Sequence, residues 1–226
     1  MHKCSTFAQI IKHCAIFSPM VVSKTRAKLV DVARQLFAKM GVENTTMNDI
    51  ALASKKGRRT LYTYFKSKEE IYLAVLQAEL EILSDMMQRV AEKDMAPDQK
   101  LIEMIYTRLD AVKEAVYRNG TLRAEFFRDI WRVEAARKQL DERELQMIKQ
   151  ILREGQEKGV FQINYIDMTA EIVHYCVKGI EVPYIRGQVG ADLDDEVRGE
   201  YVARLILGAL RAGNEPVSIH INQLNK

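Results

Sequence analysis

The feature that most constrains this chain is a basic segment from Lys55 to Lys68 that contains no acidic residue. Six of its residues are lysine or arginine, and two tyrosines and two threonines stand among them. Gly57 separates a short helical pattern before it from a second short pattern after it, and Ser67 opens a third. A short helix, a turn and a short basic helix form the arrangement that places one helix in the major groove of DNA. The segment therefore predicts a DNA-binding unit.

Charge is divided unevenly along the chain. Residues 1–70 hold thirteen lysines and arginines against five aspartates and glutamates, whereas the remainder holds twenty-one against twenty-six. This asymmetry indicates a basic nucleic-acid-binding module followed by a mildly acidic body. The 226 residues are enough for one or two domains with a buried core.

The first 22 residues differ from the rest. A short apolar run from Cys14 to Val22, interrupted by Ser18 and Pro19, faintly resembles a secretory signal but lacks a small-residue cleavage motif. Met20 would be a natural start for the helix that follows. We interpret residues 1–22 as an extension that is disordered or that arises from an upstream start.

The three cysteines have no paired spacing, which indicates a reducing compartment rather than a disulfide framework. His2, Cys4, His13 and Cys14 match no common zinc spacing, so we expect no metal site. No run is long and apolar enough to span a bilayer. We expect a cytoplasmic protein with no membrane partner.

Apolar residues recur at three- and four-residue steps along most of the chain, and no segment alternates with period two long enough for a strand. The predicted class is all-α: an N-terminal three-helix head with a helix-turn-helix, followed by a helical body. In the head we expect a helix from Thr25 to Met40 that ends at Gly41, a short helix capped by Thr45 or Thr46, and a basic helix from Arg58 to Phe65. A capping box of Ser67 and Glu70 opens a long helix to about Lys93. Further helices are expected at Asp98–Tyr117, Leu122–Leu140, Glu142–Lys158, Ile166–Val182 and Asp195–Ala212.

Several motifs in residues 25–75 occur together. They are Leu36-Phe37-Ala38-Lys39-Met40-Gly41, Thr45-Thr46, Ile50-Ala51, Thr60-Leu61-Tyr62-Thr63-Tyr64-Phe65 and Lys66-Ser67-Lys68-Glu69-Glu70. In these motifs the segment resembles the DNA-binding head of the tetracycline-repressor (TetR) family of one-component bacterial transcriptional regulators. The turn differs from the family pattern. The family usually has Ala-Gly-Val-Ser there, whereas this chain has Ser54-Lys55-Lys56-Gly57. The resemblance implies a DNA-binding domain at 23–70, an effector-binding and dimerisation domain at 71–215 and a tail at 216–226.

The basic helix carries the chemistry of base and phosphate recognition. Arg58 and Arg59 stand at its groove-entering end, and an arginine fork matches the two acceptors of guanine. Tyrosine and threonine hydroxyls can donate to phosphate oxygens, and Lys68 suits a phosphate contact. The alternatives are that Tyr62 and Tyr64 pack the core of the head and that the turn lysines are only solvated. The expected DNA contacts are Thr46, Asn48, Lys55, Lys56, Arg58, Arg59, Thr60, Tyr62, Tyr64 and Lys68.

The body carries no phosphate-cradling loop, no His-Glu-x-x-His and no nucleophile elbow, so we expect neither an enzyme nor a cofactor. Glu142 and Glu144 lie on mixed-charge faces and are expected to be solvated. Some residues of the apolar helices could line an effector cavity, although such residues are more often plain core. These effector candidates are Tyr106, Trp131, His174 and Tyr175.

The last two predicted helices carry apolar stripes. The resemblance implies that two such helix pairs form a four-helix interface in a homodimer whose heads read palindromic double-stranded DNA. It also implies repression that a small-molecule effector relieves. A helical scaffold without DNA binding is the alternative, but it would not explain the acid-free basic segment; a DNA-processing enzyme is weaker still. The expected interface residues are Val173, Val177, Ile180, Tyr184, Val202, Leu205, Ile206 and Ala209.

Overall fold

The computed structural model describes residues 23–118 and 130–211, and within them every regular element is an α-helix. The predicted all-α class is confirmed. None of the described helices combines the length and apolar composition that crossing a membrane requires. The expectations for residues 1–22 and 216–226 lie outside the described residues. In chain order the helices are α2 (Lys24–Met40), α3 (Met47–Ala53), α4 (Arg58–Tyr64), α5 (Lys68–Ala91), α6 (Pro97–Arg118), α8 (Ile130–Glu157), α9 (Ile166–Ile185) and α10 (Asp195–Arg211).

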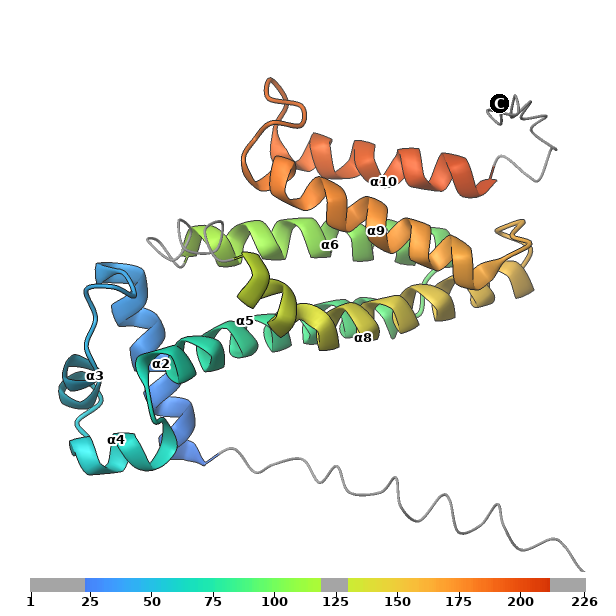
Figure 1. Cartoon of the computed structure of the whole chain (residues 1–226). Coiled ribbons are helices and arrows are strands. Elements are labelled where there is room, and N and C mark those ends of the chain that lie inside the picture. The colour runs from blue at the N-terminus through green and yellow to red at the C-terminus, as the bar shows by residue number, and fades with distance from the viewer. Residues whose placement is uncertain (1–22, 119–129, 212–226) are drawn as a thin grey trace, which may run out of the picture.

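Helices α2, α3, α4 and the start of α5 pack into a small head at one end of the molecule (Figure 1). Isolated helices as short as α3 and α4 are unstable in water, so their position depends on a shared core. Each helix of the head places at least one side chain in that core with no exposed surface. These side chains include Leu29 and Phe37 of α2, Ile50 of α3, Leu61 of α4 and Ile71 of α5.

A complete capping box fixes the start of α3. The Thr46 hydroxyl accepts a hydrogen bond from the Asp49 amide at 3.2 Å, and the Asp49 carboxylate accepts one from the Thr46 amide at 2.9 Å. The Thr46 hydroxyl also donates to the Asp49 carboxylate, and this bond together with that from the Thr46 amide holds the pKa of the Asp49 carboxyl below its usual value. Thr45 is instead buried, and its hydroxyl donates to the Gly41 carbonyl at 2.7 Å. Of the two predicted caps, Thr46 is therefore the correct one.

The capping box predicted at the start of α5 is only half formed. The Ser67 hydroxyl accepts from the Glu70 amide at 3.2 Å, as predicted. The Glu70 carboxylate, however, accepts from the amide of Lys66 and not from that of Ser67. The reciprocal bond has moved one residue upstream, and α5 still begins at Lys68.

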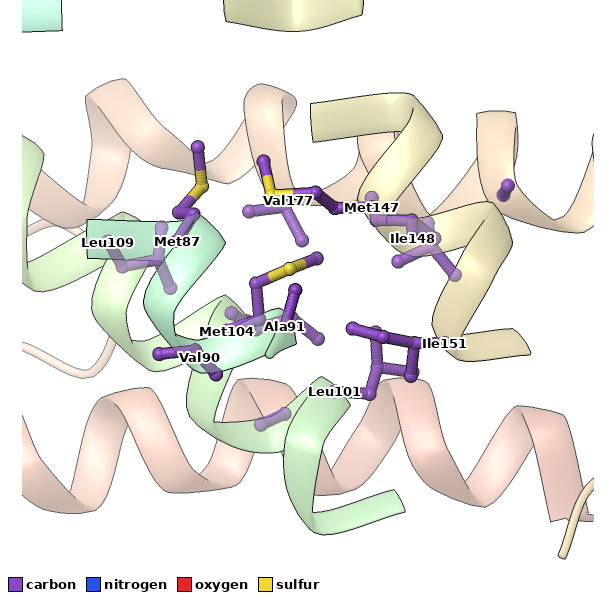
Figure 2. Packing of buried hydrophobic residues seen from close by; sticks show 14 of the residues in the cluster. Met87, Val90, Ala91, Leu101, Met104, Leu109, Met147, Ile148, Ile151 and Val177 are labelled. Carbon is purple, nitrogen blue, oxygen red and sulfur yellow. The ribbon is translucent and has the colours of Figure 1, made fainter. Parts of the chain in front are cut away.

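Helix α5 leaves the head and continues into a second, larger core. Figure 2 shows Met87 and Ala91 of α5 close to Met104 of α6 and Met147 of α8. Helix α9 packs against α8 and α6, and α10 packs against α6. At that last contact a Cβ on Gly199 would lie 2.6 Å from the Tyr106 ring, so the glycine permits the close approach of α10 to α6.

Two predicted helix boundaries were wrong. A break was predicted between Leu140 and Glu142, but α8 is continuous across it. No proline or glycine stands there, and Leu140 and Met147 keep one buried face on both sides. Helix α9 continues to Ile185 and holds Pro183 in its last turn. Pro183 has no amide to donate to the preceding turn, but the helix still closes after it, with the Arg186 amide donating to the Val182 carbonyl at 3.1 Å.

A network of buried charges ties α6, α8 and α9 together. The guanidinium of Arg108 on α6 lies 2.8 Å from a Glu144 oxygen on α8 and 2.9 Å from a Glu181 oxygen on α9. Arg137 donates two hydrogen bonds, both of 2.7 Å, to the two oxygens of Glu181. Burial alone would raise the pKa of the Glu181 carboxyl, but the Arg108 and Arg137 charges outweigh it and the pKa lies below its usual value.

The network corrects the prediction for Glu144, which was expected to be solvated. Its side chain is only 3% exposed. The periodicity of mixed-charge residues along α8 did not reveal this, because the compensating Arg108 comes from a different helix. A buried charge is tolerated when its partner is fixed nearby, and that partner was not visible in the local pattern.

We predict that Arg108→Met destabilises the protein by about 3–5 kcal/mol, because Glu144 would remain buried without its arginine. Urea unfolding at neutral pH measures the change. Arg143→Met is the matched control, since Arg143 pairs with Glu81 at the surface and its removal should cost about 0–1 kcal/mol. Equal stability of the two variants would contradict the prediction.

Candidate nucleic-acid interface

Helix α4 is held by its apolar face and presents a basic outer face. Leu61 and the adjoining Phe65 have no exposed surface, which fixes the rotation of the helix against the head. Arg58 and Arg59 in its first turn are exposed, and Tyr62 is 38% exposed. The α4 surface that faces solvent therefore combines positive charge with aromatic and hydroxyl groups.

The turn between α3 and α4 explains the departure from the family pattern. Lys55 has a φ of 56°, the only positive φ among the described non-glycine residues. Its amide donates to Leu52 and the Lys56 amide donates to Ala51, both at 3.0 Å. These two bonds form a Schellman motif, in which glycine is preferred at the position that Lys55 occupies. Gly57 stands instead at the N-cap of α4 with a φ of −65°, where no glycine is required.

The two tyrosines of α4 have different environments. The Tyr64 hydroxyl lies 3.0 Å from the Ser23 hydroxyl in a half-buried contact, so Tyr64 ties α4 to the start of α2. The Tyr62 side chain is exposed to solvent, and the Tyr62 backbone carbonyl accepts from the Lys66 ammonium at 3.3 Å. The core-packing alternative therefore fits Tyr64 better, and a phosphate contact fits Tyr62 better.

Two of the expected phosphate contacts have roles within the head itself. The Thr46 hydroxyl donates to the Asp49 carboxylate at 2.6 Å in addition to capping α3. The Lys68 ammonium donates to the carbonyls of Val42 at 2.7 Å and Glu43 at 3.1 Å. Lys68 thus fastens the start of α5 to the loop before α3. Asn48 and Lys55 are exposed, whereas Lys56 and Thr60 are half-buried.

The effector candidates do not share one environment. His174 is buried, but the adjacent Tyr175 is 67% exposed on the outer side of α9, so it cannot line the interior of a single chain. Tyr106 packs on Gly199 of α10. Trp131 belongs to α8, but its side chain lies outside the described part of the structure.

The structure also corrects the predicted interface face of α9. Val173, Val177 and Tyr184 are at most 3% exposed and belong to the chain's own core, so they are not part of the exposed face of α9. Ile180, Val202 and Ile206 are partly buried against that core, whereas Leu205 and Ala209 are exposed. The exposed apolar residues of these helices, between 43% and 67% exposed, are Met168, Ile172 and Tyr175 on α9 and Val197, Tyr201 and Leu205 on α10.

One group of side chains in the body was not predicted from the sequence. Asp141 and Glu144 on α8 and His174 on α9 place their ligand atoms within 4.8 Å of one another. The three-residue spacing of Asp141 and Glu144 was visible in the sequence as two acids on one face of a helix. His174, however, comes from a separate helix, so the group of three could not be recognised from local spacing. The expectation of no metal site was made without this grouping, because its three members are not close together in the sequence.

Comparison with known proteins relates the head and the fold to one family. Residues 29–75 match the family model described as bacterial regulatory proteins, tetR family. The chain is 26% identical over 156 residues to the HTH-type transcriptional regulator QacR of Staphylococcus aureus, covering 68% of this chain and 82% of QacR. It is 25% identical over 199 residues to the HTH-type transcriptional repressor KstR2 of Mycolicibacterium smegmatis, covering 85% of this chain and 94% of KstR2.

The fold is also similar to that of solved structures. The transcriptional regulator FadR of Bacillus subtilis, solved in complex with stearoyl-CoA, superposes with a TM-score of 0.59. The match covers 82% of this chain and 99% of FadR, at 14% sequence identity. At that identity the likeness extends to the fold and not to the ligand.

The turn geometry predicts opposite effects for its two lysines. Lys55→Gly should stabilise the protein by about 0.5–1 kcal/mol, because glycine adopts a positive φ without the clash of a Cβ. Lys56→Gly removes the same charge at a residue with negative φ and should instead destabilise it. Thermal and urea unfolding of both variants measure the difference, and a stabilising Lys56→Gly would contradict this account of the turn.

Proposed function

The chain belongs to the tetR family of bacterial regulatory proteins, and on that premise we propose that it is a repressor that binds a palindromic operator as a homodimer and is released by a small-molecule effector. It acts by binding and not by catalysis. Its partners are double-stranded DNA, a second copy of itself and the effector, and its place of action is the cytoplasm, where bacterial DNA lies.

The observation that carries this proposal is the basic outer face of α4. Between Lys55 and Lys68 no acidic side chain opposes the positive charge, and Arg58 and Arg59 are exposed at the start of the helix. The N-terminal part of a recognition helix is the part that reaches base edges. We assign base reading to these arginines and phosphate contacts to Lys55, Lys56 and Tyr62.

Dimerisation is supported by the exposed apolar residues of α9 and α10. Met168, Ile172 and Tyr175 recur at four- and three-residue steps, so they form one stripe along α9. Val197, Tyr201 and Leu205 form a stripe along α10 in the same way. Gly208 is exposed beside Leu205 and would allow a partner helix to approach closely. A two-fold contact between two such pairs would cover both stripes.

Effector control is supported by the course of α5. Ile71 and Val75 of this helix lie in the head core, and Met87 and Val90 lie in the body core. A ligand that binds one arrangement of the body better than another would therefore shift the position of the head. FadR is a regulator whose solved complex holds stearoyl-CoA in this fold. For this chain we propose a small molecule bound in the body, with His174 as the candidate contact that faces inward.

The DNA-binding proposal is tested once selection from a random duplex pool has given the preferred operator. Arg58→Ala or Arg59→Ala should then cost about 1–3 kcal/mol on that operator and relax the preference at one base position. Titrations on matched and scrambled duplexes measure both effects. Full retention of the preference in both variants would refute base reading by α4.

Lys56→Gln is the control for those variants. It removes one phosphate contact, so it should weaken all duplexes nearly equally and reduce the salt slope by about one. Lys68→Ala, first expected to behave in the same way, should in addition lower stability because the Lys68 ammonium holds the Val42 and Glu43 carbonyls. A loss of sequence preference in Lys56→Gln would contradict the division between arginine and lysine.

We predict that Tyr201→Asp converts the dimer into a monomer, because the substitution places a charge in the centre of the apolar contact. Sedimentation at micromolar concentration measures the change. Ile82→Asp is the matched control, since Ile82 is 47% exposed on α5, away from α9 and α10, and this variant should remain a dimer. A dimeric Tyr201→Asp would refute the proposed interface.

A further inference from the structure

Three potential metal-ligand atoms meet at one point between α8 and α9. They are a carboxylate oxygen of Asp141, a carboxylate oxygen of Glu144 and a ring nitrogen of His174, and all three lie within 4.8 Å of one another. Asp141 Oδ1, Glu144 Oε2 and His174 Nδ1 are buried and make no hydrogen bond, and the last two face each other as an ion pair. The side chains of Glu144 and His174 are 3% and 5% exposed, respectively, so water does not reach them freely. Buried polar atoms that make no hydrogen bond are costly, and one bound cation between them would satisfy all three.

The other oxygen of each carboxylate is already held. The Arg108 guanidinium engages the second oxygen of Glu144 at 2.8 Å. The Lys178 ammonium donates to the second oxygen of Asp141 at 2.7 Å. Cationic groups from α6 and α9 therefore hold one oxygen of each carboxylate and leave the other oxygen available to a ligand. Outer partners that orient the ligands in this way are typical of metal sites.

The spacing of the atoms fits a small divalent ion. Glu144 Oε2 and His174 Nδ1 lie 3.3 Å apart. Two ligands of a tetrahedral zinc ion, bound at about 2.0–2.1 Å, are separated by about 3.4 Å. The Asp141 oxygen lies within 4.8 Å of both other atoms, so a modest rotation of this partly exposed side chain would complete the set. One imidazole and two carboxylates are ligands that suit zinc and similar transition metals.

Charge balance indicates what else the site would bind. Among the described side chains of the cluster, Asp141, Glu144 and Glu181 balance Arg108, Arg137 and Lys178. A divalent ion would add an excess of positive charge in a buried place. Three protein ligands also leave the fourth tetrahedral position open. That position would therefore take an anion, such as hydroxide or a carboxylate.

We propose that Asp141, Glu144 and His174 bind one divalent transition-metal ion per chain, with Zn²⁺ as the representative ion, and that the ion keeps one position open for an anionic ligand. This site goes beyond the proposed DNA-binding function and does not depend on it. The competing interpretation is that the three residues belong only to the buried ion network around Arg108.

Titration of the chelator-treated full chain with Zn²⁺, in competition with a chromophoric chelator, tests the proposal. The wild type should bind one ion that Asp141→Asn and His174→Gln each weaken at least 100-fold. Lys178→Met leaves all three ligands in place but frees Asp141, and it should weaken binding by about 10–100-fold. Co²⁺ in place of Zn²⁺ should give the visible absorption of a tetrahedral ion in the wild type alone.

Two controls separate this site from other metal-binding groups. His13→Gln removes a histidine of the N-terminal segment, and Asp167→Asn removes an exposed carboxylate that pairs with Lys149. Both should bind Zn²⁺ like the wild type. If His174→Gln fails to fold by circular dichroism, Asp141→Asn and Lys178→Met decide the question, because both side chains are partly exposed. Wild-type affinity in these two variants, or no binding by the wild type, would overturn the proposal and leave a structural ion network.

Discussion

The ion pairs of Arg108 are the constraint on which the helical body depends. A guanidinium that is 1% exposed is stable only where carboxylates meet it, and here they come from α8 and from α9. The apolar residues around it are mostly methionine, leucine, isoleucine and valine, which tolerate repacking. A slip of one helix by a turn, about 5.4 Å, would keep those residues in contact but would leave the arginine unpaired. The charges therefore select one register among several that hydrophobic packing alone would allow.

Helix α5 extends this constraint to the head. It is 24 residues long, which corresponds to about 36 Å, and it has no proline or glycine along its length. One end is buried among α2, α3 and α4, and the other end is buried among α6 and α8. A rigid helix shared by two cores does not let them move independently, so a change in the packing of α8 against α5 reaches α4 without any intervening flexible segment. This continuity is the physical basis for effector control in the proposed function.

Local signals predicted the parts of the fold that local interactions determine. The basic helix from Arg58 to Phe65, the end of the first helix at Gly41 and the all-helical class could be predicted from residue types and their spacing. The errors arose where a distant segment decides the outcome. Glu144 was expected to be solvated because Arg108 lies on another helix, and Val173 and Val177 were assigned to a dimer because an apolar stripe does not say which surface it meets. The distinction between Tyr62 and Tyr64 likewise depends on Ser23, which is far away in sequence.

The turn between α3 and α4 shows how stability and binding oppose each other in this head. A lysine with positive φ costs stability that a glycine would not, and Gly57 supplies no side-chain cap to α4. The tightly packed core of Leu29, Phe37, Ile50 and Leu61 offsets these local losses, because it holds both short helices without help from the turn. What Lys55 adds is a positive charge in the turn, three residues before Arg58. In the proposed DNA complex that charge would lie near the phosphates that flank the bases read by α4, which gives the strained lysine a function that glycine could not provide.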